Sequence, residues 1–208
     1  DQSMAKTTAK NSASMSTVRL GEVADLLRLP PGVRDEEIKK GGKKVRVVSI
    51  VDLPEAGYIG TVPDVISLSK EKFDTIKKYK ILPFDVLMSI QGTVGRVGVV
   101  PEKFSGDWIG NISLLVIRFK DQKMENAVAL LEFLKSAYGR KVVSKLEKGT
   151  TIRRINVKEF AAVQVPELTT DVKRQSQSLF AKELKLLEKI NELHESMAQL
   201  RVGYLAAK

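Results

Sequence analysis

Leucine recurs every seven residues near the end of this 208-residue chain. A second apolar series runs beside the leucines, and Glu183 is its one polar member. Segment 171–206 contains no proline, and its only glycine is Gly203, so little in it would interrupt a helix. Leucine at every d position of four heptads is typical of a coiled coil. The segment is therefore predicted to form one helix, roughly 50 Å long, whose start Thr170 or Asp171 can cap.

A helix of this length cannot pack wholly against a globule made by the rest of the chain, so its apolar seam is expected to need another helix. The repeat of 3.5 residues and the narrow seam favour pairing between helices. The alternative is a helix that lies on its own domain. We predict dimerisation through the seam residues Leu179, Leu186, Ile190, Leu193, Met197, Leu200 and Tyr204.

The chain before this helix reads as a mixed α/β, or α+β, domain over 17–168, which leaves 169–208 as a separate helical region. Residues 1–16 are small and polar and lack an apolar h-region, so we expect a disordered leader and not a signal peptide. Apolar residues then recur at helical spacing and predict a short helix that ends before Pro30. These residues are Leu20, Val23, Ala24 and Leu27.

Runs of β-branched and apolar residues predict strands at 45–50, 85–90, 96–100 and 112–119, the last of which is expected to be central. The glycines from Gly92 to Gly98 are flanked by β-branched residues, which favours a hairpin or bulge over a phosphate-binding loop.

Beyond these strands, apolar residues from Ala127 to Tyr138 lie at helical spacing and predict an amphipathic helix with Gly139 in the C′ position. Residues 150–155 then read as a short β-like piece. Asn156 can cap a single helical turn that extends to Phe160. A last strand is predicted at 161–165, where Pro166 closes it.

Composition excludes several kinds of site. The chain has no cysteine, which rules out disulfides and thiolate zinc sites, and its single histidine, His194, is too few for a histidine-based metal centre. The stretch Gly41-Gly42-Lys43-Lys44 lacks the Ser or Thr that holds magnesium in a P-loop. We therefore predict no catalytic residue, no metal and no cofactor on this chain. No apolar run approaches the ~18 residues of a membrane span, so we expect a cytoplasmic protein.

The chain carries a formal net charge of +10, and most of it lies before the long helix, because residues 171–208 hold seven Lys and Arg against five Asp and Glu. Lysines and arginines gather in two dense clusters in this part of the chain. Such clusters favour binding of a polyanion such as nucleic acid, since each phosphate contact releases a condensed counterion. The alternative for each cluster is a solvated surface. The two clusters, both expected on loops that bear glycine, comprise Lys39, Lys40, Lys43, Lys44 and Arg46, then Arg140, Lys141, Lys145, Lys148, Arg153 and Arg154.

Several short motifs occur in a fixed order along the chain. Phe84-Asp85-Val86-Leu87 leads into the turn Gly92-Thr93-Val94-Gly95, Gly149-Thr150-Thr151-Ile152 follows, and Val165-Pro166 and Gln175 come last. In this order the chain resembles, over 17–206, the target recognition domain plus the conserved helical region of the specificity subunit of type I restriction-modification systems. The family usually has glycine where this chain has Phe84.

The resemblance implies a subunit that is not an enzyme. Such a subunit reads a bipartite DNA sequence and docks methyltransferase subunits that bind S-adenosylmethionine, and restriction subunits that use ATP can join. A full-length subunit carries two recognition domains and two helices that pair antiparallel as a spacer, whereas this chain has one of each. The resemblance therefore implies a half-subunit, and we predict a homodimer on double-stranded DNA that reads an interrupted palindrome.

Contacts with DNA are expected to divide into phosphate contacts from the two basic clusters and base contacts from side chains with fork or amide geometry. We expect base readers in the 32–46 loop and around Gln91, Thr93 and Arg96, and next at Lys148, Arg153 and Arg154. The alternative for the turn at 92–95 is a scaffold role. Trp108 is expected to lie in the core or to have a shielding role, and not to stack on a base.

Two other functions stay open at the level of sequence. The chain can be a non-specific assembly protein, in which the coiled coil is the functional part and the basic charge only solubilises. It can also be an enzyme that acts on nucleic acid, although the lack of a metal-binding cluster or an acid–base constellation argues against this.

Overall fold

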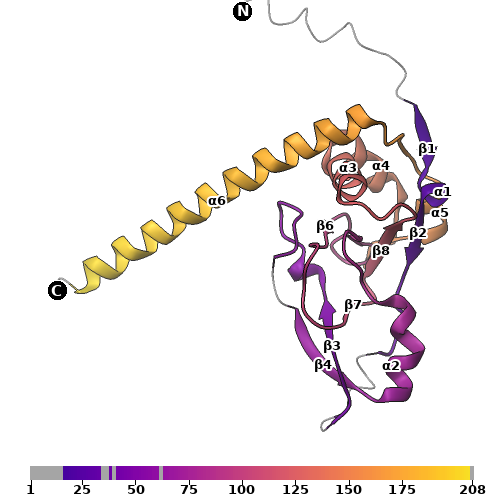
Figure 1. Ribbon diagram of the computed structural model, residues 1–208, viewed down its shortest axis with the longest axis horizontal. Helices are drawn as coiled ribbons and strands as arrows, with labels where there is room; N and C mark the ends of the chain where they lie inside the picture. Colours follow the sequence, from indigo (N-terminus) through magenta and orange to yellow (C-terminus); the bar gives the residue numbers. More distant parts are fainter. Residues whose placement is uncertain (1–15, 34–37, 39–40, 61–62, 207–208) are drawn as a thin grey trace, which may run out of the picture.

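The computed structural model describes residues 16–33, 38, 41–60 and 63–206, and for residues 191 and 200–206 it describes the backbone alone. The leader predicted at 1–16 therefore lies, apart from Ser16, outside the described residues. Figure 1 shows the strands and a group of helices gathered in one body, from which a single long helix extends. The predicted mixed α/β class with a long C-terminal helix is confirmed.

A four-stranded antiparallel sheet, with strand order β2-β8-β5-β6, lies at the centre of this body. Its strands are β2 (Ala24–Leu27), β8 (Leu114–Phe119), β5 (Val86–Ser89) and β6 (Val97–Val99). The predicted strands at 85–90, 96–100 and 112–119 are confirmed, and β8 lies inside the sheet as expected. Alternate residues of β5 face opposite layers, Met88 towards the helices and Leu87 towards the second sheet, so the strand reads as a continuous apolar run.

The helix predicted from Leu20 to Leu27 is wrong beyond its first turn. α1 (Leu20–Val23) has four residues, and the chain then extends into β2, where Leu26 pairs with Ile117 of β8. The apolar spacing fits a helix as well as a turn followed by a strand, and the open edge of β8 satisfies the extended backbone. Before α1, β1 (Thr17–Arg19) pairs with β11 (Gln164–Pro166), which joins the two ends of the domain.

A smaller mixed sheet packs on the far side of the four-stranded sheet. It has the order β4-β3-β7, with β4 (Asp64–Leu68), β3 (Lys43–Val48) and β7 (Trp108–Gly110). β3 is antiparallel to β4 and parallel to β7. The strand expected at 45–50 is confirmed, but it begins earlier, so part of the expected 32–46 loop is strand. Between the strands lie η2 (Ile50–Asp52), α2 (Lys70–Ile76) and η3 (Lys77–Tyr79), and Trp108 is buried.

The helix predicted from Ala127 to Tyr138 is interrupted at Ser136, so its predicted end is wrong. α3 (Met124–Lys135) packs against β5 and β6. Ser136 is extended, and its Oγ accepts a hydrogen bond from the Gly139 amide at 3.0 Å, which caps a second helix, α4 (Ala137–Leu146). Gly139 is thus inside a helix start, where a Cβ would lie 2.0 Å from the Phe133 carbonyl oxygen. The glycine permits this close approach, and the prediction that it occupies a C′ position is wrong.

A short hairpin of β9 (Glu147–Lys148) and β10 (Arg154–Ile155) follows α4. The strand expected at 150–155 is therefore mostly hairpin loop. Asn156 caps α5 (Val157–Ala161) as predicted, because its Oδ1 accepts from the Lys158 amide at 2.8 Å. The strand expected at 161–165 begins at Gln164, since Ala161 ends α5.

The terminal helix α6 (Thr170–Ala206) is one continuous helix of 37 residues. Its cap is Thr169, one residue before the two candidates, and Thr169 Oγ1 accepts from the Val172 amide at 3.3 Å. The first half of α6 packs against α3. None of the helices in the described part of the chain is long and apolar enough to cross a membrane.

Candidate functional site

Loops from several elements meet at one end of the four-stranded sheet. Because its strands are antiparallel, the end of β2, the start of β8 and the β5–β6 turn lie at the same edge. The β9–β10 hairpin joins this edge, since the Gly92 amide donates to the Arg153 carbonyl at 3.0 Å and Gln91 forms a bridge with Arg154. We call this region the loop end, defined as residues 28, 90–96, 111–113 and 147–155.

The turn at 91–96 is held from below by Ser89, which is fully buried. Ser89 Oγ donates to the Thr93 carbonyl and accepts from the Arg96 amide at 2.9 Å. Gly92 has φ +79°, a conformation that glycine adopts without strain. The turn is therefore rigid, with Thr93 and Arg96 exposed on it. Sequence reasoning missed Ser89, although it is the one polar residue in an apolar strand.

Arg28, just after β2, connects two of these loops. Its Nε donates to the Ile112 carbonyl at 2.9 Å, and its Nη2 donates to Gln91 Oε1 at 3.2 Å. The Arg28 side chain is exposed. Sequence reasoning also missed this arginine, because it belongs to no motif and lies far from Gln91 in the chain. The two side chains meet because β2 and β5 both pair with β8.

The second basic cluster lies beside the turn, but mostly on α4 and on the hairpin rather than on glycine-bearing loops. A Cβ added at Gly95 would lie 3.4 Å from a methyl group of Val143 in α4. Two cations of the cluster pair with carboxylates, Arg153 with Glu147 at 3.2 Å and Lys148 with Glu159. The others are exposed and form no ion pair with another described residue. They are Arg140, Lys141, Lys145 and Arg154.

The first basic cluster lies away from the loop end. Lys43 begins β3, and the other end of β3 points to the loop end, because the Asn111 amide donates to the Val48 carbonyl at 2.8 Å. At about 3.3 Å per residue, Lys43 is roughly 16 Å from Val48 along the strand. Figure 1 shows the start of β3 at the lower edge of the body. The two clusters therefore do not form one continuous patch among the described residues.

Two members of the first cluster have structural partners. Lys43 Nζ lies 3.3 Å from Asp107 Oδ2, and Lys80 also pairs with Asp107. The hydrogen bond from Lys80, and then that from Lys43, holds the pKa of Asp107 below its usual range. Arg46 Nη1 donates to the Pro63 carbonyl at 3.2 Å, whereas Lys44 is exposed. Lys39 and Lys40 lie outside the described residues.

Of the predicted DNA-binding residues, the structure gathers one group at the loop end. This group comprises Gln91, Thr93, Arg96, Lys148, Arg153 and Arg154. Lys43, Lys44 and Arg46 lie apart from it on β3. Arg96 also contacts η2, where its Nη1 donates to the Ile50 carbonyl at 3.4 Å.

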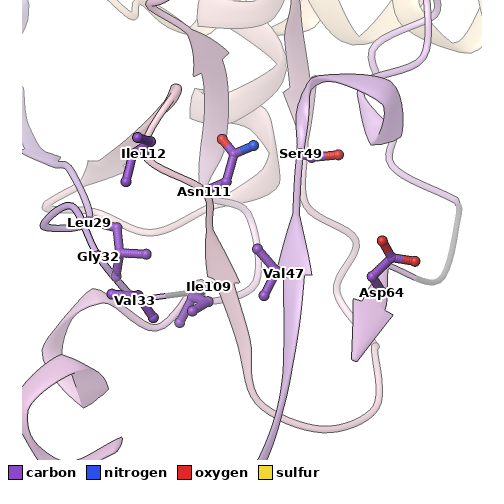
Figure 2. A pocket seen from close by; sticks show the side chains of 9 residues that line it. All are labelled: Leu29, Gly32, Val33, Val47, Ser49, Asp64, Ile109, Asn111 and Ile112. Atoms are coloured by element: carbon purple, nitrogen blue, oxygen red, sulfur yellow. The ribbon is translucent and has the colours of Figure 1, made fainter. Parts of the chain in front are cut away.

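A cavity of about 440 Å³ opens between β3, β7 and the segment after β2. Figure 2 shows Leu29 and Val33 on one side of it, Val47 on the other, and Ile109 between them. Its polar lining includes Asn111, whose Oδ1 accepts from the Ser113 amide at 3.0 Å and so shapes the neighbouring turn. Within the described ranges, no group of three His, Cys, Asp or Glu side chains could hold a metal ion. The loop end offers hydrogen-bond donors and positive charge.

The heptad seam of α6 is largely uncovered along its described length. Leu186 is 59% exposed and Leu193 64% exposed, and the remaining described seam residues Leu179, Ile190 and Met197 are also exposed. The side chains of Leu200 and Tyr204 lie outside the described residues. A different stripe of α6 packs on the body, with Phe180 buried and Leu184 half-buried. At 3.6 residues per turn, the two stripes are about a quarter turn apart.

Several solved structures with a similar fold come from type I restriction-modification systems. A chain from the structural study of complex assembly and conformational transition of such a system is 19% identical, with a TM-score of 0.58 over 93% of this chain and 43% of that chain. The HsdS subunit from Thermoanaerobacter tengcongensis is 19% identical, with a TM-score of 0.57 over 90% of this chain and 42% of that subunit.

The S subunit of the type I system of M. genitalium is 14% identical, with a TM-score of 0.50, and the match covers 87% of this chain and 42% of that subunit. At these identities the likeness concerns the fold. This chain spans about two fifths of the length of the structures it matches. No curated protein is similar enough to match.

The model of one protein family matches most of the chain. It is the family described as type I restriction modification DNA specificity domain, and the match runs over residues 13–199. The match therefore includes the loop end, both sheets and the described part of the heptad seam. The motif order at 84–95, 149–152 and 165–166 falls within the same range. The chain belongs to the family of type I restriction-modification DNA specificity domains.

Proposed function

We propose that this chain is a DNA-sequence-reading subunit that directs a type I methyltransferase to its target. The observation that carries the proposal is the family match over 13–199, which includes a loop end that bears arginine and amide side chains, with the unpaired cations of α4 nearby. Basic side chains hold the phosphates, and rigidly placed loop residues read the base edges. The chain itself performs no catalysis and binds no cofactor under this proposal. It acts in the cytoplasm.

The α4 cations supply the phosphate contacts in this proposal. Lys141 and Lys145 are four residues apart and lie on the same side of α4, on the face opposite Val143, the α4 residue nearest Gly95 of the turn. Each phosphate that a lysine neutralises adds about 0.9 to the slope of log affinity against log salt. Lys141 and Lys145 together then account for up to about two units of that slope.

The partner for the α6 seam is a second copy of this chain. Five exposed apolar side chains at heptad spacing favour a paired helix, since each leaves apolar area in water in the monomer. A two-fold dimer would place two identical loop ends on the duplex, separated by the helices. The expected target is therefore an interrupted palindrome. Methyltransferase subunits that carry S-adenosylmethionine complete the complex, and restriction subunits that use ATP can join it.

The test is methylome sequencing of a host that lacks other type I systems and expresses this chain with its methyltransferase. We expect methylation at one interrupted palindrome. Methylation at no defined sequence would contradict the sequence-reading function, and a motif with two different halves would contradict the homodimer. Equal affinity of the purified chain for DNA and heparin, without a methyltransferase partner, would instead favour a non-specific assembly protein.

Charge changes test the assignment of the phosphate contacts. Lys141→Gln with Lys145→Gln should reduce the salt slope by up to about two, with the target motif unchanged. The matched pair Lys43→Gln with Lys44→Gln changes the same charge on β3, and we expect a smaller effect because Lys43 already pairs with Asp107. An equal or larger effect of the β3 pair would move the phosphate contacts to the first cluster.

A further inference from the structure

We propose that Arg28 and Gln91 act as one coupled reader of a guanine in the major groove. The proposal rests on the proposed function, because it concerns how the loop end reads DNA. Gln91 was expected among the readers from the sequence, whereas Arg28 was not.

The two side chains are positioned before any ligand binds. The Arg28 guanidinium donates through Nε to the Ile112 carbonyl at 2.9 Å and through Nη2 to Gln91 Oε1 at 3.2 Å. Gln91 is fixed in turn, because its backbone bridges to Arg154 and the next amide, Gly92, donates to Arg153. A long exposed arginine normally loses rotamer freedom on binding, and these bonds reduce that loss.

The pair presents mainly hydrogen-bond donors. A guanidinium has five N–H groups and no acceptor, so three N–H groups of Arg28 remain after its two bonds, both of those on Nη1 and one on Nη2. For the same reason only the amide oxygen of Gln91 can face Arg28. The Gln91 amide nitrogen therefore points elsewhere, and its two N–H groups have no partner among the described residues.

Guanine is the base that matches this surface. Its major-groove edge carries two acceptors, N7 and O6, whereas adenine combines an acceptor with a donor and cytosine offers a donor. The outer fork of a guanidinium spans N7 and O6 of one guanine. Thymine, with a single acceptor beside a methyl group, satisfies at most one donor of the pair.

A DNA phosphate is also an acceptor, so the experiment must separate a base from a phosphate. The full chain is incubated with a randomised duplex, and the bound sequences are read for the wild type and for four variants. Arg28→Ala removes the fork, and Arg28→Lys keeps the charge but not the fork. Gln91→Glu keeps the acceptor for Arg28 but replaces the amide donors with an acceptor. Arg174→Ala, at an exposed arginine on α6, is the control.

Guanine preference at one position should fall about 5- to 150-fold in both Arg28 variants, with the other positions retained. In Gln91→Glu the preference beside that position should shift towards cytosine or adenine, which offer donors. Arg174→Ala should leave the motif unchanged. Thermal unfolding of each variant shows whether a loss reflects misfolding, and Arg28→Lys retains the test if Arg28→Ala unfolds.

Uniform weakening on all sequences, with a salt slope lower by about one in Arg28→Ala, would identify a phosphate contact and overturn the base-reading role. An unchanged motif in both Arg28 variants would overturn it as well. In either case the wild type still selects a motif, so the proposed function stands. If the wild type selects no motif, the proposed function fails and the inference fails with it.

Discussion

The two halves of α6 have different surroundings although they form one helix. In the first half, Phe180 enters the core and contacts Tyr58, with ring centroids 6.2 Å apart, and Lys135 of α3 pairs with Glu183. In the second half, the described side chains between 188 and 199 are exposed, apolar seam residues included. The first half is held by its own domain, whereas the second half presents a surface without a partner in the monomer.

The two arrangements predicted for the terminal helix are therefore not exclusive. The sequence offered a helix on its own domain or a helix paired with another. The structure shows the helix on its own domain through one stripe and leaves a separate heptad seam, a quarter turn away, free to pair. The four variants below test this division, beginning with the largest expected effect.

Phe180→Ala should lower the free energy of unfolding by about 3–5 kcal/mol, because it leaves a cavity where a ring is now 6% exposed. Urea unfolding at low protein concentration measures it. The control Leu193→Ala, on the exposed seam of the same helix, should cost less than about 0.5 kcal/mol under the same conditions. Equal losses at both positions would mean that the two halves of α6 are not distinct.

Leu186→Glu with Leu193→Glu should raise the dissociation constant of the proposed homodimer at least about a hundredfold, equivalent to about 2.7 kcal/mol, because it would bury two unpaired carboxylates. Sedimentation equilibrium measures the change, and the far-ultraviolet circular dichroism of the monomer should be unaltered. Gln177→Glu with Gln199→Glu adds the same charge on the opposite side of α6 and should leave the dimer intact. A dimer that persists in the leucine variant would place the interface elsewhere.

Lys135→Met should destabilise the docked half by about 1–2 kcal/mol. Lys135 Nζ contacts Glu183 and the Ala56 carbonyl, the latter at 3.3 Å, and the pair with Glu183 is only partly exposed. Its removal would leave Glu183 and the neighbouring Glu132 without a counter-charge. Denaturant unfolding measures the loss. Lys189→Met, on the free half, is the control and should be close to neutral, and an equal loss there would contradict the role of the ion pair.

Glu132→Gln should give the smallest effect, a stabilisation below about 1 kcal/mol at neutral pH. Burial raises the pKa of Glu132, the charge of Lys135 opposes this, and the nearby Glu183 adds to the rise. The Oε1 atom of Glu132 is buried without a hydrogen-bond partner among the described residues. Because the pKa of Glu132 is higher in the folded state than in the unfolded state, its contribution to stability is fully present below the unfolded-state pKa. That contribution is lost as the pH rises through the folded-state pKa. The advantage of the variant should therefore appear above the ordinary glutamate pKa and vanish below it. Unfolding curves across that pH range measure it, and a constant difference would contradict the titration.

The strong periodic elements were predictable from the sequence. The heptads predicted α6, the apolar runs predicted β5, β6 and β8, and Asn156 predicted the start of α5, because each depends on spacing along the chain. The breaks between elements were not predictable. Ser136 caps α4 and so separates it from α3, although the apolar spacing of the sequence continues across it. Pairing with the edge of β8 makes Ala24–Leu27 a strand.

One departure from the family pattern has a structural meaning. Phe84 stands where the family usually has glycine, and its φ is +66°, which makes it the only non-glycine residue with a positive φ among the described residues. Such a conformation costs an L-residue roughly 1–2 kcal/mol.

The next residue, Asp85, is fully buried and accepts from Arg118 Nε at 2.9 Å and Nη2 at 2.7 Å. Burial raises the pKa of Asp85, and the Arg118 hydrogen bonds oppose this.

The sequence alone determined that a leucine seam recurs along one helix, that most of the basic charge lies before that helix, and which motifs occur in which order. These are properties of spacing and composition, and they need no knowledge of which segments meet. Only the tertiary structure decided which polar side chains lie together, because strand pairing brings Arg28 to Gln91, whereas Lys43 lies at the end of β3 that is far from them. It also decided that α6 docks through Phe180 and leaves its heptads exposed, since packing selects among the stripes that one helix offers.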